Sequence, residues 1–437
     1  MFQSHRNHQD RGMHAYLYLF ASFMIELLTW SLPFSYGVFL NYYNSHRLGS
    51  ATPSSVSGEP STNKAEQSST LALVGTLATG IMYLAYPFVL RTTSLYPWYC
   101  RHIMAAGLLL CVAGLCGAAF SSRPWHFIVT QGIVYSLGGS LLSFPSVAFL
   151  FEWFPERRGL AMGILFSGTG IGGIAMPFVI DEMLRTLGQR WTFLILAASF
   201  VGLLVPCFVF IKPRLPAVPS NTRTRTRLID VSFLRNGAFW PLFVCSTLQG
   251  LGNFVPGIYL PSYTTDIGLG NTAATLFAAL INGASVPGAI FIGWATDRLD
   301  LRWPILLSTV GAALASFLLW GFAQSGIQLG IFAIVYGFTA GGFSAMWPRF
   351  ASAIAKDDVR LATLVYSLFG ASRGVGNILA GPISSALLSN STRVRYGMSN
   401  YGPLILFTGA TMLASACGTA FGLFGRAGGT RARPRAS

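Results

Sequence analysis

Charge is what this sequence has least of. Only 10% of the 437 residues are Asp, Glu, Lys or Arg, whereas a soluble domain has roughly 25%. Acidic side chains are the scarcest, with 14 Asp and Glu against 29 Lys and Arg. A soluble protein of this length would carry more charge at its surface, and burial in lipid explains the shortage better. The composition therefore argues against a soluble protein.

The net charge of +15 does not predict a nucleic-acid partner. Nucleic-acid sites combine basic and aromatic residues on one surface, and here the basic residues stand between long apolar runs. We expect no nucleic-acid partner and interpret the basic residues as topology signals of a membrane protein.

Residues that carry catalytic or metal chemistry are also scarce. The six cysteines lie in or beside apolar runs without a CxxC pair, and the six histidines lie outside such runs or at their ends. Both patterns are typical of structural residues rather than metal ligands. No Walker A motif is present, and the G-x-G-x-x-G at 168–173 lies inside an apolar run, which indicates close helix packing. We therefore expect no metal, no cofactor and no enzymatic activity.

Twelve apolar runs are long enough to cross a bilayer, which takes about 20 residues per helix. The alternating pattern of a lipid-facing barrel strand is absent, so helices are the predicted spanning element. The sequence thus predicts an all-α membrane protein with twelve transmembrane helices. We expect these helices near 15–41, 69–90, 99–120, 126–150, 159–183, 190–211, 238–263, 271–296, 303–323, 327–349, 361–388 and 402–424.

The basic residues predict the orientation of these helices. With the N-terminus inside, the inside segments hold 21 Lys and Arg, and the outside segments hold 7. Such a bias places both termini in the cytoplasm. The sequon that begins at Asn390 then falls in an outside loop, where Asn390 is a candidate glycosylation site. We take the plasma membrane as the expected location.

The longest predicted inside loop divides the helices into two groups of six. It covers 212–236 and is rich in Pro, Ser, Thr and Arg, so we expect a linker that lies on the anionic inner leaflet. We therefore predict an N-terminal half at 1–211 and a C-terminal half at 237–437 that ends in a short basic tail.

One motif resembles a known family signature. The residues 293–298, GWATDR, followed by Arg302, resemble the G-x-x-x-D-R-x-G-x-R signature of the major facilitator superfamily, with Asp300 at the second glycine. Glycine lets two helices approach closely, and an aspartate at a helix end pairs with arginine or caps a neighbouring helix. We expect a conformational latch formed by Gly293, Asp297, Arg298, Arg157 and Arg158.

The segment 131–178 resembles the monocarboxylate porter family, whose members carry [YW]-F-x-K-R-R-x-L-A-x-G-x-A-x-[AS]-G-[ST]-x-x-G between helices 4 and 5. Glu156 and Leu165 depart from that pattern. The matching residues are Trp153, Phe154, Arg157, Arg158, Leu160, Ala161, Gly163, Ser167, Gly168, Thr169 and Gly172.

This resemblance implies a fold and an activity. The fold is the major facilitator fold, with two pseudo-symmetric six-helix halves. The activity is secondary transport by alternating access, with a small organic anion such as a monocarboxylate as substrate and a proton as the candidate coupling ion. Its partners would be that small molecule and the lipid bilayer.

Other positions keep alternatives open. The family's usual Asp and Arg in helix 8 correspond to Ser285 and Ala289, and helix 1 has no lysine. These absences favour a facilitator or exporter of a neutral or larger hydrophobic metabolite on the same fold. An intramembrane enzyme would need an acid–base or metal cluster within the helices, and a nutrient sensor would be favoured by long cytosolic tails.

Only two formal charges lie deep in the predicted helices, Glu26 and Arg373. A charge at the membrane centre costs roughly 2.5–3.5 kcal/mol, so such residues are usually functional and partnered. Counted from the inner ends of their helices, both lie near the midplane, where facilitators bind substrates. We predict that Arg373 binds an anionic substrate through its forked guanidinium. Glu26 is then a counter-ion or a proton carrier, and a purely structural role for both is the alternative.

Polar residues at mid-helix form a second group of candidates for substrate binding, with hydrogen bonding between helices as the alternative role of each. The resemblance implies that helices 1, 4, 7 and 10 line the cavity. Trp30, Phe144 and Tyr259 are candidates for shaping the pocket. The polar group consists of Gln131, Tyr135, Gln249, Asn253, Asn282 and Asn377, of which Gln131, Gln249 and Asn253 lie on helices 4 and 7.

Overall fold

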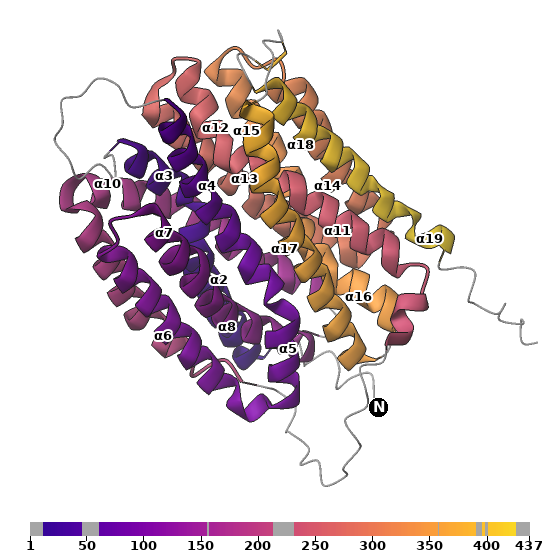
Figure 1. The fold of residues 1–437 in the computed structure, drawn as a ribbon. Helices are drawn as coiled ribbons and strands as arrows, with labels where there is room; N and C mark the ends of the chain where they lie inside the picture. Colours follow the sequence, from indigo (N-terminus) through magenta and orange to yellow (C-terminus); the bar gives the residue numbers. More distant parts are fainter. Residues whose placement is uncertain are drawn as a thin grey trace, which may run out of the picture.

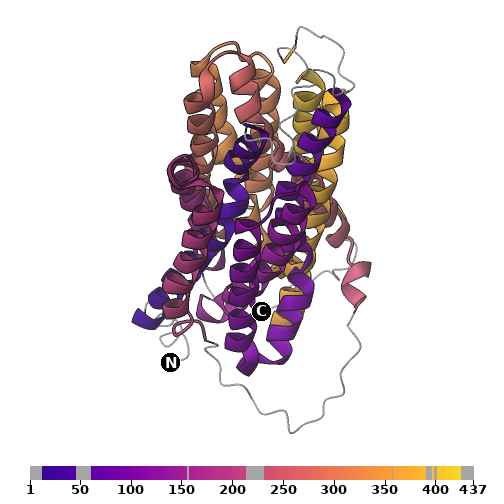
Figure 2. The same cartoon turned by 60° about the vertical axis from the view of Figure 1, so that its left-hand side comes forward.

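The computed structural model describes residues 12–45, 61–154, 157–212, 231–356, 358–389, 396–397 and 401–424. Within these ranges the regular structure is entirely helical, without a strand. The helices run along one long axis and form a single bundle (Figures 1 and 2). Figure 1 shows the earlier helices, indigo to magenta, on one side and the later helices, orange to yellow, on the other. The predicted all-helical membrane fold is confirmed.

The first half contains six membrane crossings. Proline breaks several of them into two pieces, because it lacks the N–H that an inner helical turn needs. The first crossing, for example, bends after Pro33. The crossings are built from α2 (Met13–Phe34) and α3 (Tyr36–Ser45), α4 (Ser61–Leu84) and α5 (Tyr86–Leu95), α6 (Cys100–Ala119), α7 (Pro124–Phe127) with the π-helical turn η3 (Ile128–Val134), α8 (Tyr135–Ala148) and α9 (Leu150–Trp153), and the long α10 (Arg158–Cys207).

The helix α10 supplies two crossings because the chain reverses at Gly188. This residue has φ of 73°, a backbone conformation that glycine adopts without steric cost. The side chain of Gln189 donates to the carbonyls of Ala118 and Ser121 at one end of α6. Lys212, beyond the end of α10, accepts a hydrogen bond from Trp153 close to where α10 begins. Both ends of α10 therefore lie at the same end of the bundle.

The second half repeats the arrangement after the 3₁₀ turn η4 (Val231–Arg235). Its first crossing bends at Phe254, just before Pro256. The crossings are built from α11 (Phe239–Asn253) and α12 (Val255–Asp266), α13 (Gly270–Arg298), α14 (Arg302–Leu314) with η5 (Ala315–Trp320), α15 (Gly326–Ala340) with η6 (Phe343–Met346) and α16 (Trp347–Ala355), α17 (Val359–Ser389), and α18 (Gly402–Ala414) with η7 (Ser415–Ala420) and α19 (Phe421–Phe424).

The predicted helix ranges agree with these elements to within a few residues, apart from the second crossing, where α4 begins at Ser61, and the tenth, where α16 continues to Ala355. Nine stretches of the described chain are long and apolar enough to cross a membrane, and one of them, 159–207, is the hairpin of α10. The pair α11–α12 and the helix α17 are the remaining crossings of the twelve. Most of the predicted linker and the candidate glycosylation site Asn390 lie outside the described residues.

The ends of the bundle differ in charge. One end carries Arg91, Arg157, Lys212, Arg298 and Arg349, and we call it the basic end. Odd-numbered crossings start there and even-numbered crossings return to it.

Two seams of small residues join the halves. In the first, α10 packs on α13, and a Cβ atom added at Gly163 would lie 2.6 Å from the carbonyl oxygen of Ala289. In the second, α4 packs on α17, and a Cβ at Gly374 would lie 2.8 Å from the carbonyl oxygen of Gly80. Only glycine allows backbones to approach so closely. The glycine-rich run at 168–173 therefore serves helix packing, as predicted: Gly170 and Gly173 face α13, and Gly168 and Gly172 face α2.

A carboxylate fastens the first seam at the basic end. The N–H groups of Gly159 and Leu160, in the first turn of α10, donate to Oδ1 and Oδ2 of Asp297 at 3.1 and 2.9 Å. An acceptor at this position satisfies helix N–H groups that have no partner within the helix. Asp297 belongs to the second half and α10 to the first, so this contact links the halves. Arg157 and Arg298 are exposed beside it, and the side chain of Arg158 is outside the described set.

We predict that Asp297→Ala loosens the basic end. The loss of a helix cap costs about 0.5–2 kcal/mol, and here that energy holds the two halves together. Electron–electron distance measurements between spin labels at Arg101 and Lys356 would show a larger population of long distances in the variant.

Asp300→Ala is the matched control for this measurement. Asp300 accepts from the Arg302 N–H at 2.9 Å and so caps α14 within one half. An equal change in both variants, or none in Asp297→Ala, would contradict the assignment of Asp297 as an inter-half contact.

Candidate functional site

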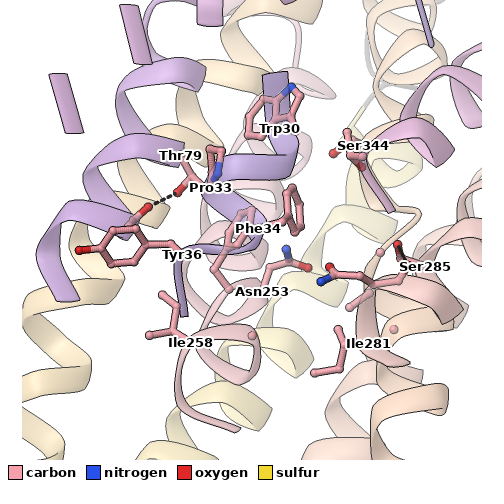
Figure 3. Close-up of a pocket in the computed structure, with 18 of the residues that line it drawn as sticks. Trp30, Pro33, Phe34, Tyr36, Thr79, Asn253, Ile258, Ile281, Ser285 and Ser344 are labelled. Atoms are coloured by element: carbon pink, nitrogen blue, oxygen red, sulfur yellow. Dashed lines mark hydrogen bonds between the residues drawn. The ribbon is translucent and has the colours of Figure 1, made fainter. Parts of the chain in front are cut away.

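A cavity of about 80 Å³ lies between the halves, near the middle of the bundle. It receives residues from α2 to α4 and α10 of the first half, and from α11 to α13, α15 and α17 of the second. In Figure 3, Trp30 and Pro33 lie on one side of the cavity and Ser285 and Ser344 on the other. An apolar cavity of about 150 Å³ binds benzene in another protein, so this cavity is small in the present conformation and must widen for a metabolite.

Arg373 is the charged residue of this cavity. The side chain is 3% exposed, and its Nη1 donates to the Ser344 hydroxyl at 2.9 Å, while Nε has no hydrogen-bond partner. No carboxylate of the described chain lies within 4.0 Å of the guanidinium. Burying a cation without a counter-ion costs free energy, so a residue in this situation usually has a functional role. The arrangement is suited to a carboxylate that arrives with a ligand.

Two predicted amide residues share the cavity with Arg373. Asn253 ends α11 and its Oδ1 accepts from Nε2 of Gln249 at 3.0 Å. Asn282 on α13 also lines the cavity, and its amide donates to the carbonyl of Gly173 on α10 at 3.2 Å. Gln249 lies behind Asn253, where it also donates to the Ala340 carbonyl at 3.4 Å. Gln249 therefore fixes the orientation of the Asn253 amide. Asn282 adds a hydrogen bond across the seam between α10 and α13.

Glu26 lies outside the cavity lining. The side chain is 1% exposed and faces the Ser143 hydroxyl and the Trp30 indole, but its Oε2 has no hydrogen-bond partner. It forms no ion pair with Arg373. The two deep charges are therefore separate, and Trp30, which lines the cavity, lies next to Glu26.

The other predicted polar residues fasten helices to one another. Nε2 of Gln131 donates to the Tyr43 hydroxyl at 2.7 Å, and the Tyr135 hydroxyl donates to the Thr29 carbonyl at 2.8 Å. In the amide orientation that satisfies both carbonyls, the nitrogen of Asn377 donates to Gly250 at 3.0 Å and to Arg373 at 3.3 Å. None of these three side chains lines the cavity.

Aromatic side chains close the cavity toward the basic end. The hydroxyls of Tyr86 on α5 and Tyr366 on α17 lie 3.1 Å apart, and Trp347 packs edge-on against Tyr366. Phe144 on α8 contacts Tyr86. We call these four residues the aromatic plug. One apolar core runs through the plug and contains residues of both halves, whereas a second core belongs to the second half alone.

Sequence reasoning missed most of the rings and hydroxyls around Arg373. Of the three aromatic candidates, Trp30 lines the cavity, whereas Phe144 belongs to the plug and Tyr259 packs beside the second core. The missed lining residues include Tyr83, Phe254, Tyr336 and Ser344. Among 34 Phe and 16 Tyr, nothing local distinguishes a ring at the cavity from a ring in lipid. The helix 8 position Ser285 does line the cavity.

Comparison with known proteins agrees with this architecture. The Major Facilitator Superfamily profile matches residues 18–294 and 242–423. An MFS-type transporter of Gibberella moniliformis is 28% identical over 398 residues, which cover 89% of this chain and 86% of the relative. The MFS transporter asaE of Aspergillus flavus is 25% identical over 423 residues, which cover 96% and 88%.

A solved structure shows the same fold. The crystal structure of the nucleoside transporter NupG superposes with a TM-score of 0.61 at 15% identity and covers 94% of this chain and 99% of that chain. At this identity the likeness concerns the fold alone. With the twelve crossings, the two seams and the matched profile taken together, this chain belongs to the major facilitator superfamily and is a membrane transporter rather than an enzyme.

Proposed function

We propose that this protein is a secondary transporter of small organic anions, with a monocarboxylate as the first candidate. The observation that carries the proposal is Arg373, a buried guanidinium that faces a central cavity between the halves without a carboxylate partner in the described chain. The segment 131–178, which resembles the monocarboxylate porter family, supports the same substrate class.

The physical argument concerns the cost of an unpaired charge. In a medium of low dielectric constant, a ligand carboxylate and a guanidinium stabilise each other more strongly than in water. The free Nε and the fixed Nη1 of Arg373 leave donors available for a carboxylate. A neutral ligand of the same shape would leave the cation without a partner, so the site selects an anion.

We further propose that Glu26 carries the proton in a proton-coupled cycle. The carboxyl group is buried, is not held in an ion pair with Arg373, and lies beside Trp30 of the cavity lining. A carboxyl group at this depth is stable when it is neutral, and it loses its proton only when water or a ligand changes its surroundings. Such a group links proton movement to opening and closing of the cavity.

The transport cycle alternates the two ends of the bundle. In the conformation described here, the aromatic plug and the Asp297 cap close the basic end. Opening that end requires both contacts to separate while the glycine seams let the halves pivot. The latch thus includes Asp297 and Gly293, and Arg157, Arg158 and Arg298 are proposed to hold it electrostatically.

An alternative substrate is a neutral or larger hydrophobic metabolite. The cavity lining favours it in one respect, because seven of the lining residues are aromatic, namely Trp30, Phe34, Tyr36, Tyr83, Phe166, Phe254 and Tyr336. Uptake measurements on Arg373→Ala distinguish a neutral substrate from an anionic one.

We propose that the basic end faces the cytoplasm of a plasma-membrane protein, with both chain termini on that side. Lys212→Cys at the basic end and Gln324→Cys at the other end are both exposed positions. In intact cells, a membrane-impermeant maleimide would label the second variant, and it would label the first only after permeabilisation. The reverse labelling pattern would show that the basic end faces the outside of the cell.

The anion proposal predicts that Arg373→Ala abolishes uptake of radiolabelled monocarboxylates into proteoliposomes. Arg373→Lys keeps the charge but loses the fork, so it should retain a reduced uptake with a higher KM. Arg190→Ala is the control, because this arginine lies over the Phe120 ring, away from the cavity. Uptake at the normal rate in Arg373→Ala would reject the anion clamp and leave a neutral metabolite as substrate.

The proton proposal predicts a different defect for Glu26→Gln. An amide cannot release a proton, so an inward proton gradient should stimulate uptake in the unmodified protein but not in the variant. Exchange of labelled for unlabelled substrate, which needs no net proton movement, should persist. Glu182→Gln, at an exposed pair with Arg185, is the matched control. Stimulation that survives in Glu26→Gln would assign the proton to another group.

A further inference from the structure

The guanidinium of Arg373 is surrounded by rings. Its central carbon lies 5.5 Å from the ring centroid of Tyr83, 5.6 Å from that of Phe254 and 5.8 Å from that of Trp347. The negative face of an aromatic ring stabilises a cation at such distances, most strongly where water is excluded. The rings therefore stabilise the guanidinium in its position while no anion is bound.

A second group of rings borders the same cavity. Trp30 packs against Tyr83 with ring centroids 4.8 Å apart, and Phe34 packs against Phe254 with centroids 5.5 Å apart. Trp30 and Phe34 belong to the first half, whereas Phe254 joins α11 to α12 in the second. The contact between Phe34 and Phe254 therefore crosses the boundary that must open during transport. A flat ring of a ligand can replace one partner of this contact when the halves part.

The described lining of the cavity carries a single formal charge. Arg373 is the only formally charged side chain among the described residues that line it. One carboxylate balances one guanidinium, whereas a second carboxylate would enter a medium of low dielectric constant without a partner. The amides of Asn253 and Asn282 add dipoles but no charge. The site is therefore matched to a single negative charge.

We propose that the substrate is a monocarboxylate that carries an aromatic ring. The carboxylate binds Arg373 and Ser344, and the ring packs among Trp30, Phe34 and Phe254. This inference rests on the proposed anion transport and narrows its substrate class. The cavity of about 80 Å³ must widen to admit the ring, and separation of Phe34 from Phe254 would provide that space.

The first experiment compares ligands and needs no variant. Uptake into proteoliposomes is measured for benzoate, for cyclohexanecarboxylate of similar size, for pyruvate, for phthalate with its second carboxylate, and for neutral benzyl alcohol as a competitor of benzoate. Benzoate should be preferred over cyclohexanecarboxylate about 2- to 12-fold, the range expected for ring–ring contacts. Phthalate uptake and competition by benzyl alcohol should both be at least about tenfold weaker than benzoate.

A second experiment locates the preference. Phe34→Leu and Phe254→Leu should lower the ratio of benzoate to cyclohexanecarboxylate uptake toward one, while cyclohexanecarboxylate uptake persists and reports a folded protein. Phe88→Leu, at a ring that is 75% exposed on α5, is the control and should keep the ratio.

The outcomes of these experiments distinguish the aromatic-substrate proposal from the proposed anion transport on which it rests. Equal uptake of benzoate and cyclohexanecarboxylate, or a preference for pyruvate, would overturn the aromatic substrate and leave the anion transporter standing. If none of the acids is taken up, both the aromatic substrate and the anion-transport function are rejected. Strong uptake of phthalate would overturn the argument from single charge.

Discussion

The two glycine seams between the halves are the constraint on which the structure depends. A backbone that approaches within the reach of a Cβ atom leaves no room for side chains, so the contact between α10 and α13 and that between α4 and α17 stay narrow. Elsewhere the halves are separated by side chains, and the central cavity lies in that space. The seams thus fix where a ligand can be enclosed and about which lines the halves can pivot.

The cavity shows how few polar groups such a protein needs. Arg373 supplies one charge, Ser344 fixes one of its nitrogens, and the pair of Gln249 and Asn253 holds an amide at the lining. Aromatic rings form a large part of the boundary and serve three purposes there. They exclude water, they stabilise the guanidinium through their π faces, and across the halves they form contacts that separate without breaking hydrogen bonds. The hydroxyl contact of Tyr86 and Tyr366 is the polar exception, and it lies toward the basic end.

Much of the fold was predictable because lipid restricts the options so severely. Long apolar runs must be helices, and glycine and proline mark where those helices touch or bend, so the helix limits and the packing role of 168–173 followed from the sequence. Glu26 and Arg373 are both buried within the bundle, as their positions in the middle of long apolar runs indicated.

The sequence did not predict the rotation of each helix about its own axis, and this rotation decides which side chains face the cavity. Gln131 and Tyr135 have the right depth but face neighbouring helices rather than the cavity. Glu26 and Arg373 are both buried and yet form no ion pair with each other. From the sequence, Tyr83 and Phe254 could not be distinguished from the aromatic residues that are exposed at the surface of the bundle. Roles in substrate binding and proton movement depend on this rotation and remain proposals to be tested.

The cap formed by Asp297 also has a consequence for the environment in which the protein operates. Its carboxylate is exposed at the basic end and acts on a helix terminus of the other half. Attraction between exposed charges and helix dipoles weakens as dissolved ions accumulate around them. We therefore expect this contact between the halves to weaken as the ionic strength of the solution at the basic end rises.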